Sequence, residues 1–188
     1  FDLNITMRGA FGHQILNYQK MYYGNPTILY NVLNGMEGVS CERCFAPWTD
    51  MEQALKEAGE ELFTLETRAP LKSFDIVGFS LLYEMCYSNI LTMLELGHIP
   101  FLSRDRGLEY PLLVAGGPCA VNPEPIAPFF DAVIIGDGEE AEPELVNAYR
   151  ASRAAGDTLL AMAKKGSMLG KERLTEAAQA ADKAVHDL

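Results

Sequence analysis

Three stretches of the chain are apolar almost without interruption, and each has the length of a strand. They cover residues 75–81, 112–115 and 132–135. Unbroken apolar runs of this length are typical of strands that are buried on both faces, as in parallel sheets. Two further short strands are predicted at residues 41–46 and 62–65.

Between the strands, apolar residues recur at helical spacing and are bounded by residues that begin or end helices. The predicted helices begin with Pro26 after the cap Asn25, cover 51–58 between Asp50 and Gly59, cover 87–96 before Gly97, and cover 139–153. Strands that alternate with helices in this way predict right-handed crossovers. The predicted fold class is therefore α/β, with a doubly wound parallel sheet of the Rossmann-like kind.

The same pattern divides the chain into three parts. Residues 1–25 carry no clear period and stay unassigned, residues 26–153 form the predicted α/β domain, and residues 154–188 form a helical tail or a linker to a further domain. An apolar helical face is predicted in this tail, made of Leu174, Ala178, Ala181, Val185 and Leu188. Such a face either docks on a partner or packs on the chain's own sheet.

Glycines stand at the carboxyl ends of the buried strands. In open parallel sheets ligands bind beyond these ends, and glycine lets a ligand approach the backbone closely. The pattern therefore predicts a ligand pocket at this edge, and the alternative is that the glycines only make tight turns. The predicted pocket residues are Ser80, Leu82, Tyr83, Glu84, Gly116, Gly117, Pro118, Asn122, Gly136, Gly138 and Glu139.

Carboxylates dominate the last of these loops, residues 136–140 with the sequence GDGEE. Three carboxylates without a lysine would repel an anion, so this is not a phosphate-binding loop. Glu139 and Glu140 either stabilise the start of the next helix through its dipole or accept hydrogen bonds from a ligand. Glu84 likewise either accepts a hydrogen bond from a ligand or caps the following helix. Trp48 either covers the rim of the pocket or packs half-buried.

Composition narrows the classes of function. The 188 residues are 48% hydrophobic and carry a formal net charge of −11, without a basic stripe. Direct nucleic-acid binding is therefore not expected, because it needs clustered Lys and Arg. No apolar run approaches the ~20 residues that span a bilayer, so no membrane partner is expected. The chain has four cysteines and enough hydrophobic residues to form a core without disulfides. This suggests a reducing compartment, and a cytoplasmic location is predicted.

Two long phrases of the sequence resemble one protein family. They run from CFAPWTDMEQ to LELGHIP (residues 44–100) and from PLLVAGGPC to IIGDGEE (residues 111–140), with FAPW, ETRAPL, GFSL, AGGP, NPEP and GDGEE in the family's order. They resemble the N-terminal region of an uncharacterised radical S-adenosylmethionine (radical SAM) family. In that family a cobalamin-binding-like Rossmann domain precedes the iron–sulfur barrel. The resemblance covers residues 26–150, and the usual first strand of the domain is expected to be missing or altered.

The resemblance implies a cobalamin site that departs from the usual pattern. Classical cobalamin-binding domains carry Asp-x-His-x-x-Gly, then Ser-x-Leu, then Gly-Gly. The last two elements match residues 80–82 and 116–117, whereas the first is absent. None of His13, His98 and His186 stands in the cobalt-ligand motif, and an isolated histidine is more often a surface residue. Cobalamin is therefore expected to bind, if this chain uses it, without a histidine on cobalt.

The cysteines do not form the family's catalytic motif. A [4Fe–4S] cluster that binds S-adenosylmethionine needs Cys-x-x-x-Cys-x-x-Cys, and no triplet among Cys41, Cys44, Cys86 and Cys119 has that spacing. The cluster and S-adenosylmethionine are therefore expected only in the rest of the parent protein. Cys41 and Cys44 have two possible roles. They are functional, as half of a zinc site or as reactive thiols, or they are simply two small buried or edge residues. No metal site and no catalytic residue is predicted in this chain.

Three functions remain open at this point. The first is an accessory module of a radical SAM enzyme, which partners a barrel domain in cis or in trans and helps to bind cobalamin or to shape the substrate cavity. The second is a binding or docking module with the same fold and without a corrinoid, which takes a small-molecule ligand or only closes a cavity. The third is a free-standing small-molecule enzyme that uses the acidic loop.

Overall fold

A computed structural model describes residues 3–9 and 26–164, with side chains over residues 28–156. The chain divides into two compact units, Phe1–Glu139 and Glu140–Leu188. The first unit contains every strand of the described sheet, and the candidate site belongs to it. The predicted domain boundary at residue 153 stays a prediction.

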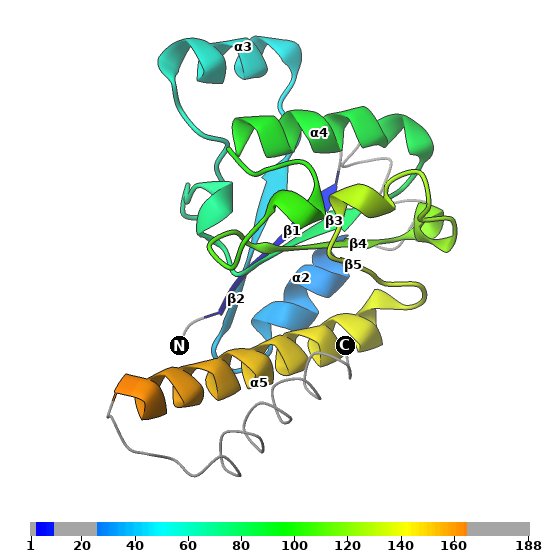
Figure 1. Cartoon of the computed structure of the whole chain (residues 1–188). Helices are drawn as coiled ribbons and strands as arrows, with labels where there is room; N and C mark the ends of the chain where they lie inside the picture. Colours follow the sequence, from blue (N-terminus) through cyan, green and yellow to red (C-terminus); the bar gives the residue numbers. More distant parts are fainter. Residues whose placement is uncertain (1–2, 10–25, 165–188) are drawn as a thin grey trace. The chain divides into compact units, whose positions relative to one another are not determined.

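A five-stranded parallel sheet forms the centre of the first unit (Figure 1). Its order is β2-β1-β3-β4-β5. The strands are β1 Leu3–Gly9, β2 Val39–Phe45, β3 Ile76–Ser80, β4 Leu112–Gly116 and β5 Ala132–Val133. All four pairings are parallel. The prediction that the runs from residues 75, 112 and 132 form neighbouring parallel strands is thus confirmed, and the fold is α/β, compatible with the Rossmann-like class.

The first strand, which was expected to be missing or altered, is present as β1. It lies between β2 and β3, with Ile5 opposite both Cys41 and Ile76. Its sequence LNITMRG alternates apolar and polar residues, which is the period of a strand. Because only seven residues carry this signal, it is weaker than the unbroken apolar runs further along the chain.

Two predicted strands differ from the structure. Residues 62–65 do not join the sheet: Phe63 makes one isolated antiparallel bridge with Pro70. The backbone N–H of Leu62 instead donates to Leu96 O at 2.9 Å, and that of Leu65 donates to Arg43 O at 2.8 Å. The strand β5 is also shorter than predicted, because the chain turns out to solvent at Ile135.

The helices lie close to their predicted positions. They are α2 Pro26–Asn34, α3 Thr49–Ala58, α4 Tyr87–Leu96 and α5 Gly138–Lys164. Helix α3 begins one residue before the predicted cap, since Trp48 is its N-cap, and it ends as predicted at Gly59, which adopts φ 66°. Helix α5 continues eleven residues beyond Arg153. The predicted apolar face from Leu174 to Leu188 lies outside the described residues.

The core of the first unit lies around the sheet. Its largest fully buried side chains include Leu62, Leu71, Val77, Leu81, Leu94 and Leu113. The chain between α4 and β5 is also tied down by polar contacts, in which Arg106 donates to the carbonyl oxygens of residues 100, 101 and 129. In the described part of the chain no helix is both long and apolar enough to pass through a membrane.

Candidate functional site

The predicted site residues gather at the carboxyl edge of β3, β4 and β5. Ser80 and Gly116 are register partners in the last pair of β3 and β4. The segments that leave this edge are the 3-10 helix η2 (Glu84–Cys86), the 3-10 helix η4 (Pro118–Val121) and the loop that leads to Gly138. The geometry therefore brings the three predicted segments to one edge, as the strand directions require.

Gly117 has a packing role that the sequence interpretation did not identify. It adopts φ 105°, and a Cβ there would lie 3.1 Å from both the backbone N and O of Leu81. The two loops are joined by hydrogen bonds from Leu81 N to Gly116 O, 2.7 Å, and from Cys119 N to Leu81 O, 3.0 Å. The space over Gly117 is thus filled by the neighbouring loop, so this glycine closes two loops against each other and does not leave room for a flat ligand.

The other glycines of the edge are less constrained. A Cβ on Gly116 would meet only Ile134, at 3.8 Å, which is an ordinary contact. Gly136 adopts φ 132° and has nothing within 4 Å of a Cβ. Gly138 is the first residue of α5, and Glu139 follows it as an exposed side chain. The backbone near Gly136 is therefore open, and its role in binding a ligand stays a prediction.

A pair formed by a tyrosine and a cysteine lies at the same edge and was not identified from the sequence. The hydroxyl of Tyr87, at the start of α4, hydrogen bonds the thiol of Cys119 in η4. Partial burial raises the pKa of the Cys119 thiol, and the nearby Glu84 carboxylate and Cys86 raise it further. Burial, again the largest cause, also raises the pKa of the Tyr87 hydroxyl. Both groups therefore stay protonated at neutral pH and can donate hydrogen bonds.

This arrangement predicts how Cys119 reacts. Iodoacetamide should label it slowly at neutral pH, since the thiolate is the reactive form and the pKa of this thiol is raised. Tyr87→Phe should shift the pH–rate profile to higher pH, because the hydrogen bond from Tyr87 lowers the pKa of Cys119. Mass spectrometry of the labelled chain measures both effects. Cys119→Ser is the control and should remove most labelling, since the other three cysteines are buried; an unmoved or lowered profile in Tyr87→Phe would contradict the pairing.

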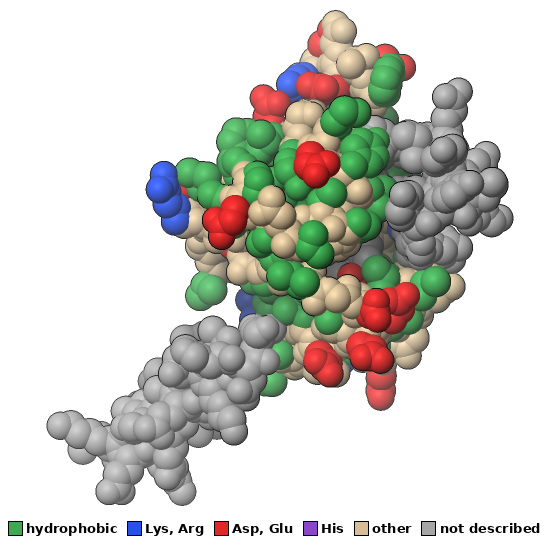
Figure 2. Space-filling view, turned by 90° about the vertical axis from the view of Figure 1, so that its right-hand side faces the viewer, with side chains coloured by type: hydrophobic (Ala, Val, Ile, Leu, Met, Phe, Trp, Pro, Cys, Tyr) green, Lys and Arg blue, Asp and Glu red, His purple; other side chains and the backbone are tan. Residues whose placement is uncertain are grey.

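Exposed hydrophobic side chains stand on each loop of this edge. Met85 follows β3, Val121 follows β4 and Ile135 follows β5, and their exposures are 80%, 73% and 64%. Figure 2 looks at the side of the molecule on which these strands end: hydrophobic side chains spread across its upper part, and several acidic side chains lie together at its lower right. Apolar side chains gathered on one face are typical of a surface that another molecule covers.

For Trp48 and Glu84 the structure excludes one of the two roles that the sequence left open. Trp48, which follows β2, is 76% exposed, so its predicted half-buried packing is wrong. Glu84 begins η2, and α4 has Cys86 as its N-cap without a side-chain capping bond. Glu84 therefore does not cap α4, and its exposed carboxylate lies close enough to Cys119 to influence the pKa of that thiol.

The described histidine and the first two cysteines do not belong to this edge. His98 follows the far end of α4, where its Nδ1 lies 3.3 Å from a Glu61 carboxylate oxygen. Cys41 and Cys44 are both buried, and Cys44 Sγ donates to Phe63 O at 3.2 Å. Among the described residues no three His, Cys, Asp or Glu side chains are grouped to hold a metal ion. His13 and His186 lie outside the residues that the structure describes.

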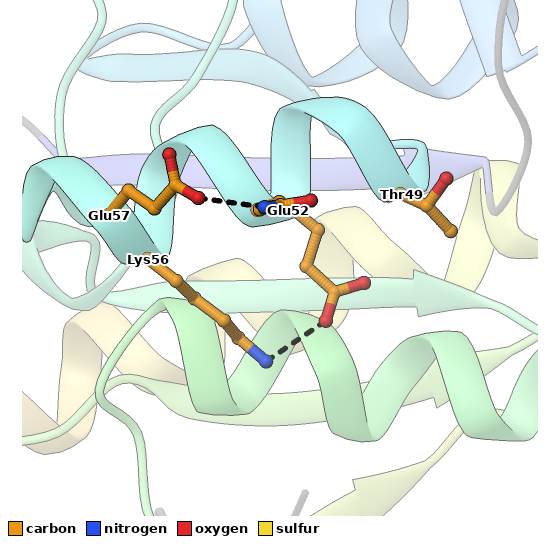
Figure 3. A pocket seen from close by; sticks show the side chains of 5 residues that line it. Thr49, Glu52, Lys56 and Glu57 are labelled. Atoms are coloured by element: carbon orange, nitrogen blue, oxygen red, sulfur yellow. Dashed lines mark hydrogen bonds and ion pairs between the residues drawn. The ribbon is translucent and has the colours of Figure 1, made fainter.

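A hollow on helix α3 is filled with paired charges. It has a volume of about 420 Å³ and is lined by Thr49, Glu52, Gln53, Lys56 and Glu57. Figure 3 shows Lys56 directed to Glu52, and the two form an ion pair at 2.9 Å. The hydrogen bonds to Glu52 and Glu95 raise the pKa of Lys56. Because these groups already satisfy one another, the hollow is not a good candidate for a ligand site.

Comparison with known proteins assigns the family. The family described as "Radical SAM proteins, N-terminal" matches residues 26–169. This match covers most of the chain, which therefore belongs to that family. No curated protein and no solved structure matches the chain.

Proposed function

We propose that this chain is the accessory module of a radical SAM enzyme and covers the barrel domain, in cis or in trans, with the carboxyl edge of its sheet. The family match supports the role of an N-terminal module. The observation that carries the choice of surface is the exposure of Met85, Val121 and Ile135, one on each loop of the edge. The [4Fe–4S] cluster and S-adenosylmethionine belong to the barrel, since this chain has no cysteine triplet of the required spacing.

The proposed ligand of this edge is cobalamin held without a protein histidine on cobalt. The exposed apolar side chains suit a flat, largely apolar ring. His98 stands at the other end of α4 and does not reach the edge. The close packing of Gly117 on Leu81 leaves the open backbone near Gly136 as the place of approach. The residues therefore fit a corrin face better than they fit a histidine-ligated cobalt.

The competing function is a docking module without a corrinoid. In that function the same side chains contact the barrel directly and close its substrate cavity. The specific observation that favours it is the filled space over Gly117, because this glycine was predicted to leave room for a ligand and does not. Both functions use the same edge, so a substitution in the edge tests the surface and a titration tests the ligand.

The experiment combines these two tests. Hydroxocobalamin is titrated into the chain and followed by absorption, and binding of the separately produced barrel domain is measured in the presence and absence of cobalamin. Val121→Glu should weaken whichever binding occurs by about tenfold or more, because a charge would be buried in an apolar contact. The matched control is Leu108→Glu, because Leu108 is almost fully exposed in the loop before β4.

The outcomes separate the proposals. Stoichiometric cobalamin binding that Val121→Glu weakens and Leu108→Glu leaves unchanged supports the corrinoid function. Barrel binding with the same dependence but without cobalamin binding supports the docking function. If neither the cofactor nor the barrel binds, or if the two variants behave alike, this edge is not the functional surface.

A further inference from the structure

Glu42 is a buried carboxylate away from the carboxyl edge. It lies in β2 and is only 5% exposed. The hydroxyls of Thr64 and Thr67 donate to it, the second at 2.8 Å, and the backbone N–H of Thr67 donates at 3.4 Å. All of these bonds reach Oε2. The carboxylate is therefore held firmly by one oxygen, and Oε1 receives none of the described hydrogen bonds.

Its negative charge is not balanced by a described side chain. Among residues 28–156 no Lys, Arg or His forms an ion pair with Glu42. The neighbouring Arg43 pairs with Glu66 at 2.7 Å. A buried carboxylate is costly unless a cation or several hydrogen bonds compensate it, and the three donors here are all neutral. A cation that reaches Oε1 would complete the compensation.

A cavity of about 340 Å³ lies against this carboxylate, beside the first residues of β2. It is lined by Gly38, Val39, Ser40, Glu42, Thr67, Ala69 and Phe74. None of these described lining residues is basic. Because the Thr67 hydroxyl donates its hydrogen bond to Glu42, it can only accept hydrogen bonds from a ligand in the cavity. Ser40 adds a hydroxyl that can accept, and the remaining walls are apolar or backbone.

We propose that this cavity binds a small primary alkylammonium ion. The three N–H donors of an ammonium match the acceptors of Glu42, Thr67 and Ser40, and its alkyl part fits against Val39, Ala69 and Phe74. An anionic ligand is excluded by the carboxylate. The site is separate from the carboxyl edge, and the proposal does not depend on the function assigned to that edge.

The test uses two cations of equal charge and different hydrogen-bonding capacity. Propylammonium chloride is titrated into the full chain at constant ionic strength, and backbone amide shifts are followed by NMR. The expected result is saturable shifts at Ser40, Thr67 and Ala69. Tetramethylammonium chloride, which has no N–H donor, should leave these amides unshifted. Equal shifts with the two cations, or no shifts with propylammonium, would overturn the proposal.

Variants test the residues. Glu42→Gln removes the charge at nearly constant size and should weaken binding by about tenfold or more, as expected for a hydrogen bond to a charged group. Glu60→Gln removes the same charge from an exposed position of the surface and should bind as the unmodified chain does. If Glu42→Gln fails to fold, Ala69→Leu decides, since it fills the cavity without touching the carboxylate and should abolish binding. Unchanged binding in Ala69→Leu or Glu42→Gln rejects the site.

Discussion

Replacing Gly117 with alanine should destabilise the first unit of the chain more than any other single-methyl addition at the carboxyl edge. Gly117 adopts φ 105°, which L-residues rarely adopt, at a cost of about 1–3 kcal/mol. The new Cβ would also stand 3.1 Å from the N and O atoms of Leu81, and backbone atoms cannot move aside as a flexible side chain can. We expect a loss of about 2–4 kcal/mol in the free energy of unfolding, measured by urea denaturation.

The neighbouring glycine provides the control. In Gly116→Ala the Cβ would meet only Ile134 at 3.8 Å, and no positive φ is required. Its unfolding free energy should change by less than about 1 kcal/mol. If the two variants lose equal stability, the close approach of Gly117 to Leu81 does not matter in solution. Hydroxocobalamin titration of Gly116→Ala then tests ligand binding at the edge without the loss of fold.

The sheet could be predicted where burial is complete on both faces. The runs that became β3 and β4 are apolar at every position that packs, so their identity as parallel strands followed from composition alone. The stretch at residues 62–65 has similar residues, yet its N–H groups bond to Leu96 and Arg43. Which partner a short apolar stretch takes depends on tertiary packing, which a local pattern does not encode.

The sequence predicts at which edge of the sheet the candidate site lies, but not which groups are exposed there. Strand direction alone places the loops after Ser80, Gly116 and Val133 together. Whether a glycine faces open space or another loop depends on distances between segments some 35 residues apart, as for Gly117 and Leu81. The pairing of Tyr87 with Cys119 has the same origin. Both residues stand within a few positions of the predicted site residues in the sequence. Their spacing along the chain, however, does not indicate that they contact each other.

The exposure of Trp48 was missed for a different reason. Tryptophan is usually largely buried, so packing was the ordinary expectation. Here the residue stands at the N-cap position of α3, makes no capping bond with its side chain, and is exposed to solvent. The side chains that mark a surface for another molecule are those that depart from the usual burial of their type. A single sequence does not contain that information, because burial is decided by the fold.

Arg106→Met should cause the second large loss of stability. The Arg106 side chain is 3% exposed and donates to Asp131 at 2.8 Å as well as to three backbone carbonyls. Asp131 in turn accepts from the backbone N–H of Leu113 at 2.7 Å and so fixes the start of β4. Methionine keeps an unbranched apolar stem, but it leaves the carboxylate without its cation and the carbonyls without donors. The expected cost is about 3 kcal/mol in urea denaturation.

Arg104→Met is the matched control, because it removes the same charge two residues earlier in the chain. The Arg104 side chain is exposed, and its Nε lies 3.8 Å from Asp105 Oδ1. Its unfolding free energy should change by no more than about 0.5 kcal/mol. Asp131→Asn completes a double-mutant cycle with Arg106→Met. If the charge pair carries the effect, the double variant should be more stable than the sum of the two single losses predicts. Strictly additive losses would show instead that the carbonyl contacts of Arg106 hold this segment, because those contacts are lost in Arg106→Met whether or not Asp131 keeps its charge.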